Sequence, residues 1–97
     1  MRISIVGSGA IGCLVGSMLS RAGLDVTLVD RHQSRIDIIR AEGLYVRMPN
    51  ERVNTKISIT GDPTSVGVCD VVMLCVKGYH TASAIEGALC MVGPNTL

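Results

Sequence analysis

The spacing of three glycines near the N-terminus constrains the fold of this chain more than any other feature. Gly7, Gly9 and Gly12 form the pattern G-x-G-x-x-G, which follows an apolar run at residues 3–6. An amphipathic segment comes next, and a second apolar run ends at Asp30. The glycine spacing alone is weak evidence, but this order of strand, turn, helix and strand, closed by an acid, is typical of a dinucleotide-binding unit.

The residues of the glycine turn are the first candidates for cofactor binding. Gly7 permits the tight turn, Gly9 lets a pyrophosphate approach the backbone, and Gly12 lets the helix lie close to the strands. The N-terminus of the helix then offers unpaired N–H donors and a partial positive charge to the phosphates. We therefore predict that the whole turn contacts the cofactor: Gly7, Ser8, Gly9, Ala10, Ile11 and Gly12.

The segments around this turn predict parallel strands with helices between them. Apolar residues at helical spacing indicate a first helix that ends at Gly23, and a second helix over residues 34–41 ends at Gly43. A helix that crosses between two strands makes the strands parallel. The apolar stripe of the first helix consists of Ile11, Leu14, Val15, Met18, Leu19 and Ala22.

The end of the second strand carries both an acid and bases. Asp30 can accept hydrogen bonds from ribose hydroxyls, which favours NAD, whereas Arg31 can pair with a 2′-phosphate, which favours NADP. Because both residues are present, the pattern leaves the choice of cofactor open. Arg35, one helical turn later, either adds to a phosphate pocket or is an exposed helix charge.

The second half of the chain begins with two β-rich runs, at residues 44–48 and 53–60. They predict a hairpin-like excursion whose inward-facing residues are Val53, Ile57 and Ile59. This excursion interrupts the alternation of strands and helices, which resumes afterwards.

The apolar run at residues 71–76 fits a central parallel strand. Val76 and Lys77, at its carboxyl end, are candidate cofactor contacts, because open α/β sheets bind ligands there. Ser83 and Glu86 form an S-x-x-E capping box for a following helix. The apolar residues of that helix are Ile85, Leu89 and Val92.

Together these segments predict an α/β fold, a Rossmann-like, doubly wound and mostly parallel sheet in three layers. The 97 residues allow one domain, and residues 96–97 resemble the start of a further strand. Because the chain stops there, we expect the sheet edge to be exposed and to promote homodimers or aggregates.

Composition excludes several other classes of protein. A net charge of +1, without runs of basic residues, gives no electrostatic case for nucleic acid. No apolar run has the length of a membrane span, of about 18 residues. The four cysteines lack metal-ligand spacing, so we predict no metal site and expect reduced, buried thiols, as in a cytoplasmic protein.

With these segments in order, the chain resembles the N-terminal domain of the ketopantoate reductase (2-dehydropantoate 2-reductase) family along essentially all of its length. The glycine turn is shared by many dehydrogenases, whereas the pattern D-V-V-x-L-x-V-K-x-Y is much more specific. The segments that carry the resemblance are GSGAIG at 7–12, RAGLDVTLVDR at 21–31, EGL at 42–44, GDP at 61–63 and CDVVMLCVKGYHT at 69–81.

The resemblance implies an oxidoreductase that reduces a 2-oxo acid to a 2-hydroxy acid with NADPH, ketopantoate to pantoate in pantothenate biosynthesis. It implies that Arg31 binds the 2′-phosphate and that Lys77 lies beside the cofactor. Members of the family continue with a helical domain that supplies the catalytic lysine and the substrate pocket. We therefore expect residues 1–97 to form an NAD(P)-binding domain, incomplete at its C-terminus, that contains no catalytic residue and is inactive alone.

A second functional class also uses a glycine turn and an acid at the end of the second strand. It comprises NAD-sensing regulatory domains of the kind that control potassium transport, which catalyse no reaction. Those domains give no reason for a hairpin in the middle of the chain or for V-K-G-Y at residues 76–79. The sequence therefore favours the reductase.

Overall fold

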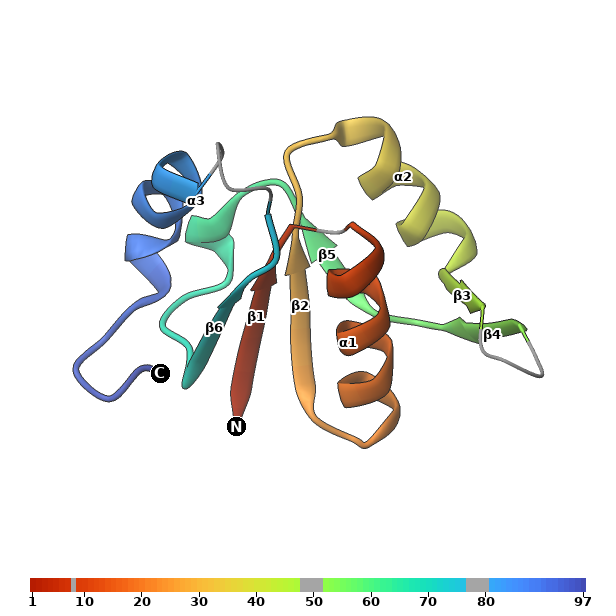
Figure 1. Ribbon diagram of the computed structural model, residues 1–97, viewed down its shortest axis with the longest axis horizontal. Helices are drawn as coiled ribbons and strands as arrows, with labels where there is room; N and C mark the ends of the chain where they lie inside the picture. Colours follow the sequence, from red (N-terminus) through yellow and green to blue (C-terminus); the bar gives the residue numbers. More distant parts are fainter. Residues whose placement is uncertain (8, 48–51, 77–80) are drawn as a thin grey trace.

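The computed structural model describes residues 1–7, 9–47, 52–76 and 81–97. Within these residues, four parallel strands form one sheet in the order β5-β2-β1-β6, and β3 and β4 form a separate antiparallel pair (Figure 1). The strands are β1 (Arg2–Val6), β2 (Asp25–Val29), β3 (Leu44–Arg47), β4 (Arg52–Thr55), β5 (Ser58–Thr60) and β6 (Val71–Leu74). The helices are α1 (Ala10–Arg21), α2 (Gln33–Glu42) and α3 (Thr81–Ala88), with short 3-10 helices η1 (Pro63–Ser65) and η3 (Leu89–Met91).

The predicted three-layer arrangement of a parallel sheet is confirmed. Strand residues alternate between two cores, so that Ile5 of β1 packs with α1, α2 and β3, while Val6 packs with α3 and η3. Because β1 lies between β2 and β6, it is paired along both edges. The glycine turn follows this central strand, which places it in the middle of the carboxyl edge of the sheet.

The β-rich run at residues 53–60 is not one strand. β3 and β4 form the predicted hairpin, with Val46 opposite Val53, but β5 pairs with β2 in the main sheet. Ile59 is therefore buried in the core of that sheet. β-branched residues suit any pleated strand, so an unbroken run of them does not show where the chain leaves one sheet for another.

The outer edge of β6 already has a backbone partner. Leu97 donates its N–H to the carbonyl of Asp70 at 2.8 Å and accepts from the N–H of Val72 at 2.9 Å. These bonds have the slanted pattern of parallel pairing. Residue 97 therefore lies where a further strand of the sheet would run, as the sequence suggested, and it pairs with the start of β6.

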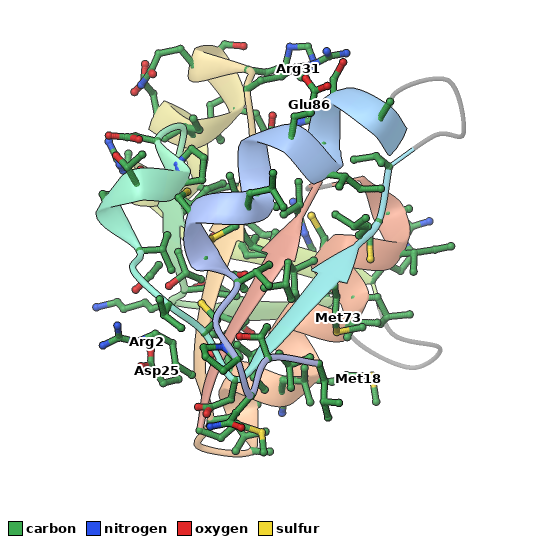
Figure 2. The ribbon with its side chains drawn as sticks, turned by 90° about the vertical axis from the view of Figure 1, so that its left-hand side faces the viewer. Arg2, Met18, Asp25, Arg31, Met73 and Glu86 are labelled. Atoms are coloured by element: carbon green, nitrogen blue, oxygen red, sulfur yellow. The ribbon has the colours of Figure 1, made fainter. Side chains whose placement is uncertain are left out.

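Helix α1 packs by its small residues and by only part of its predicted apolar stripe, since Val15 and Leu19 pack against the core. Its buried residues are Gly12, Gly16 and Ser17, while Ile11 is 71% exposed and Met18 is 57% exposed. A Cβ on Gly16 would lie 3.1 Å from Cδ2 of Leu28, so the glycine line allows the helix to lie close to the sheet. Ile11, Leu14 and Met18 are exposed, and Figure 2 shows Met18 on the same side of the molecule as Met73.

The predicted start of α3 is also wrong. The helix begins at Thr81, so Ser83 lies inside it and does not form a capping box with Glu86. Its buried residues are small or flexible, namely Ala88 and, in η3, Met91. The predicted apolar residues are exposed: Ile85, Leu89 and Val92.

The cysteines differ in exposure, and all four are free thiols. Cys69 is buried and Cys13 and Cys75 are half-buried, as predicted, but Cys90 is exposed because it lies on the outer side of η3. In the part of the chain that the structure describes, no helix is long and apolar enough to cross a membrane.

Candidate functional site

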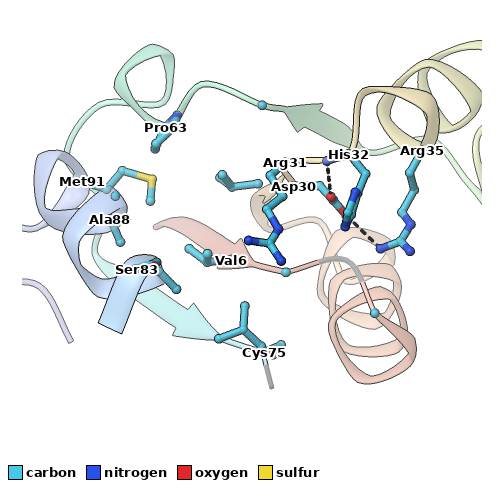
Figure 3. Close-up of a pocket in the computed structure, with 17 residues that line it drawn as sticks. Val6, Asp30, Arg31, His32, Arg35, Pro63, Cys75, Ser83, Ala88 and Met91 are labelled. Atoms are coloured by element: carbon cyan, nitrogen blue, oxygen red, sulfur yellow. Dashed lines mark hydrogen bonds and ion pairs between the residues drawn. The ribbon is translucent and has the colours of Figure 1, made fainter. Parts of the chain in front are cut away.

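A cavity of about 590 Å³ opens at the carboxyl ends of β1, β2 and β6 (Figure 3). The glycine turn and the residues after β2 form one side, and α3 with η3 forms the other. This is the place where open parallel α/β sheets bind ligands. The lining residues are Val6, Gly7, Gly9, Val29, Asp30, Arg31, His32, Arg35, Gly61, Pro63, Cys75, Val76, Ser83, Ala84, Gly87, Ala88 and Met91.

Two glycines of the turn are required by the packing of the backbone. Gly7 has φ +102°, and a Cβ there would lie 2.5 Å from the carbonyl oxygen of Cys75. A Cβ on Gly12 would collide with the carbonyl oxygen of Gly7. The N–H of Gly7 donates to the carbonyl of Val29 at 2.8 Å, so the turn is fixed against β2, β6 and α1 at once.

Gly9 is different, because a Cβ there would meet no described atom within 4 Å. The residue lines the cavity, and its carbonyl accepts the N–H of Cys13 at 2.9 Å at the start of α1. The first N–H groups of a helix have no partners inside the helix and carry a partial positive charge. A glycine with open space beside a helix N-terminus suits the close approach of a phosphate group, so this wall of the cavity fits a dinucleotide.

Asp30 lies at the end of β2, and its carboxylate is engaged within the protein. Oδ1 accepts the N–H of His32 at 2.8 Å, and Oδ2 accepts from Nη1 of Arg35 at 3.1 Å. The backbone N–H of Asp30 donates to the carbonyl of Thr60 at 3.0 Å. Only 3% of its side chain is exposed, so the acid contributes little accessible surface to the cavity that it lines.

Three basic residues surround this acid and also line the cavity, namely Arg31, His32 and Arg35. Figure 3 shows the side chain of Arg31 reaching into the cavity, and that of Arg35 descending from α2 toward Asp30. This end of the cavity therefore presents more positive than negative charge, which suits an anionic group of a ligand.

Cys13, on the first turn of α1, is influenced by the same charges. Burial raises the pKa of its thiol above the ordinary value of 9.0. The positive charge of Arg35 acts in the opposite direction, and the negative charge of Asp30 adds a smaller increase to that pKa. The thiol is therefore held in its neutral form beside the turn.

The structure brings half of the predicted site residues to one cavity. Among the predicted residues, the cavity is lined by Gly7, Gly9, Asp30, Arg31 and Val76. Ala10, Ile11 and Gly12 adjoin it in the first turn of α1 but do not line it. Ser8 and Lys77 lie outside the described residues.

Sequence reasoning did not single out the wall that faces the turn. Gly61 and Pro63 follow the end of β5, and Ala84 and Ala88 come from α3. The position of residues 61–63 after a β-rich run was a usable signal, because carboxyl ends of parallel strands meet at one edge. Small apolar residues on a helix carry no such signal. Among the described residues, no three of His, Cys, Asp and Glu gather in a group that could hold a metal ion.

Comparison with known proteins agrees with the site's geometry. The model of the family described as ketopantoate reductase PanE/ApbA matches residues 3–97. This chain belongs to the ketopantoate reductase family. The family uses a nicotinamide dinucleotide, so the chain is a Rossmann-like, NAD(P)-binding domain of the 2-dehydropantoate 2-reductase type.

Individual relatives support the assignment over a limited length. A 2-dehydropantoate 2-reductase from Halobacterium salinarum is 38% identical over 85 residues, which are 87% of this chain and 28% of that protein. The crystal structure of a ketopantoate reductase from Ralstonia eutropha is 35% identical, with a TM-score of 0.90, and the match covers 99% of this chain and 32% of that one.

D-mandelate dehydrogenase, in a ternary structure with NADH and anilino(oxo)acetate, is 25% identical. Its TM-score is 0.91, and the match covers 99% of this chain and 31% of that one. This chain therefore spans about a third of the length of the relatives it matches.

Proposed function

We propose that this chain is the cofactor-binding domain of an NADPH-dependent reductase that converts 2-dehydropantoate (ketopantoate) to pantoate. The observation that carries the proposal is the cavity at the carboxyl edge of the sheet, with open space at Gly9 at one end and Arg31 at the other. Membership of the ketopantoate reductase family supports the reaction. It favours a reductase over an NAD-sensing regulatory domain of the potassium-transport type.

The residues of this chain bind and orient the cofactor. The pyrophosphate lies against the turn from Gly7 to Gly12, where Gly9 leaves room and the N-terminus of α1 supplies N–H donors. Val76, which lines the cavity, and Lys77, which is next in the sequence, contact the cofactor. When bound, the nicotinamide supplies a hydride to the carbonyl carbon of the substrate. In this proposal, the general acid and the substrate pocket belong to the part of the relatives that this chain does not span.

The proposal assigns the 2′-phosphate of NADP(H) to Arg31. Its side chain is exposed and reaches into the cavity, next to an acid that is buried. Guanidinium groups bind phosphates through paired, charge-assisted hydrogen bonds. The alternative is NAD, which a relative of this fold holds as NADH, and a binding experiment separates the two cofactors.

Substitution of Arg31 by alanine tests this assignment. We expect Arg31→Ala to lower the affinity for NADPH by more than about tenfold, because a charged hydrogen bond to phosphate is lost. The affinity for NADH should change by less than about twofold, because NADH has no 2′-phosphate. Titration of intrinsic cofactor fluorescence measures both affinities. Arg21→Ala, at the far end of α1, is the matched control for the loss of one positive charge.

The same titration contains the result that would contradict the assignment. Equal NADPH affinities for the protein and Arg31→Ala would exclude a role of Arg31 at the 2′-phosphate. The reaction itself is tested by turnover of ketopantoate with NADPH by the protein that contains this chain. Cofactor binding without turnover in that protein would favour the regulatory alternative.

A further inference from the structure

The usual role of an acid at the end of the second strand does not fit Asp30. Such an acid accepts hydrogen bonds from ribose hydroxyls, which requires carboxylate oxygens at the surface of the cavity. The side chain of Asp30 is only 3% exposed, and its two oxygens already accept from the N–H of His32 and from Arg35. Although Asp30 lines the cavity, its carboxylate presents little surface to a ribose hydroxyl.

Arg35 has the properties that such a recognition residue needs. It lines the same cavity as Arg31, and 47% of its side chain is exposed, although Nη1 lies 3.1 Å from Oδ2 of Asp30. A guanidinium has five N–H donors in a planar fork, so one group can hold a carboxylate and a phosphate oxygen at the same time. The bond to Asp30 fixes a side chain that would otherwise lose much rotamer freedom on binding a ligand.

The charges also suit a phosphate. Asp30 contributes one negative charge, and Arg31 and Arg35 contribute two positive charges, so this group is positive overall with His32 neutral. Because Arg35 lies directly on the carboxylate, it offsets the repulsion that an unpaired acid would exert on a phosphate. The acid next to Arg31 is thus compatible with NADP.

We propose that Arg35 is a second residue that recognises the 2′-phosphate of NADP(H), and that Asp30 is the positioning residue that holds it. The inference rests on the proposed function, because it requires a dinucleotide in this cavity. It makes the ribose end a two-arginine clamp supported from behind by a buried acid. It also assigns to Asp30 a role that favours NADP, opposite to the role expected of an acid at this position.

A double-mutant cycle between Arg35 and Asp30 tests the proposal. The affinities for NADPH and NADH are measured for the protein and for Arg35→Ala, Asp30→Asn and the double variant. We expect Arg35→Ala to weaken NADPH binding by about tenfold and NADH binding by less than about twofold. In the Asp30→Asn background, the same change should weaken NADPH binding by no more than about threefold, because Arg35 is no longer held.

Three variants serve as controls for this cycle. Arg21→Ala, which removes a distant positive charge, should leave the preference for NADPH over NADH unchanged. Arg35→Lys keeps the charge without the planar fork and should weaken NADPH binding by about threefold. Arg35→Lys replaces Arg35→Ala in the test if circular dichroism shows that Arg35→Ala is unfolded. Asp30→Asn should change NADH binding by less than about twofold, because the carboxylate does not reach the ribose.

Two results would overturn the inference. One is an Arg35→Ala variant that binds NADPH as the unchanged protein does, or that loses both cofactors equally. The other is a loss of about tenfold or more in NADH affinity in Asp30→Asn, which would show that Asp30 binds the ribose hydroxyls. If the unchanged protein binds neither cofactor, the proposed function itself is wrong. If it binds NADPH but Arg35→Ala has no effect, only the role of Arg35 is wrong.

Discussion

The carboxyl ends of β1 and β2 border the same cavity but are built from different groups. After β1 the wall is formed by Gly7, which has no room for a side chain, and by Gly9; behind them Gly12 has no room for a side chain either. After β2 the wall is made of charged side chains, namely Asp30, Arg31 and Arg35. After β1, close backbone packing determines the shape of the cavity wall. After β2, charged side chains determine which ligand groups the wall can bind.

Substitutions at these two places should therefore have different effects, one on folding and the other on ligand specificity. A substitution at Gly7 or Gly12 disturbs the contacts of the turn with Cys75 and with the start of α1, so it acts on the whole domain. Arg31 is exposed, so a substitution there should leave the strands and helices in place and, in the proposed complex, change the affinity for the cofactor. The glycine turn after β1 should thus tolerate few substitutions. The residues after β2 can be substituted to suit different cofactors.

The largest effect that we expect is on stability, from Gly12→Ala. The added Cβ collides with the carbonyl of Gly7, which belongs to a backbone fixed on three sides. We expect the free energy of unfolding to fall by about 3 kcal/mol, as for severe overpacking. Denaturant titration followed by circular dichroism measures this change.

Gly87→Ala is the matched control for that experiment. Gly87 lies within α3, and a Cβ there would meet no described atom within 4 Å. Alanine is favoured over glycine in a helix, so this variant should be more stable by about 0.5–1 kcal/mol. Equal stabilities of the Gly12→Ala variant and the unchanged protein would break the distinction between the two ends.

A smaller effect concerns the reactivity of Cys13, which lies between the two ends. Burial raises the pKa of its thiol, and the thiolate is the reactive form. At pH 8 we expect iodoacetamide to modify the exposed Cys90 about tenfold faster than Cys13. Mass spectrometry of the two peptides over time gives both rates.

The modification rates of Cys13 and Cys90 can also be measured with cofactor bound. NADPH lies against the first turn of α1 in the proposed complex, so it should slow the modification of Cys13 further and leave Cys90 unchanged. Faster modification of Cys13 than of Cys90 would show that the thiol is not held in its neutral form.

The sequence was sufficient for the parts of the fold that depend on backbone chemistry. The glycine spacing predicted the strand, turn, helix and strand that the structure contains, and Gly43 ends α2 with φ +83° as a stop signal should. Parallel pairing followed from the crossover helix. These features depend on the rules for single residues or short segments, so a local pattern determines them.

Packing faces and partners could not be predicted in the same way. Ile11 and Met18 have an ideal helical spacing, yet they are exposed, and the helix turns Gly12 and Gly16 to the sheet. Nor does a pattern show that the carboxylate of Asp30 faces Arg35 and not the cavity. Such outcomes depend on which distant segments meet.

The central claim is that the turn and the cavity hold a dinucleotide, and Gly9 tests it most directly. Gly9→Ala fills the space where a phosphate would approach, but its Cβ meets no described protein atom within 4 Å. Titration of NADPH into the unchanged protein should give saturable binding. In Gly9→Ala the affinity should fall by at least about tenfold, while the free energy of unfolding changes by less than about 1 kcal/mol. Equal NADPH affinities of the two folded proteins would contradict the account.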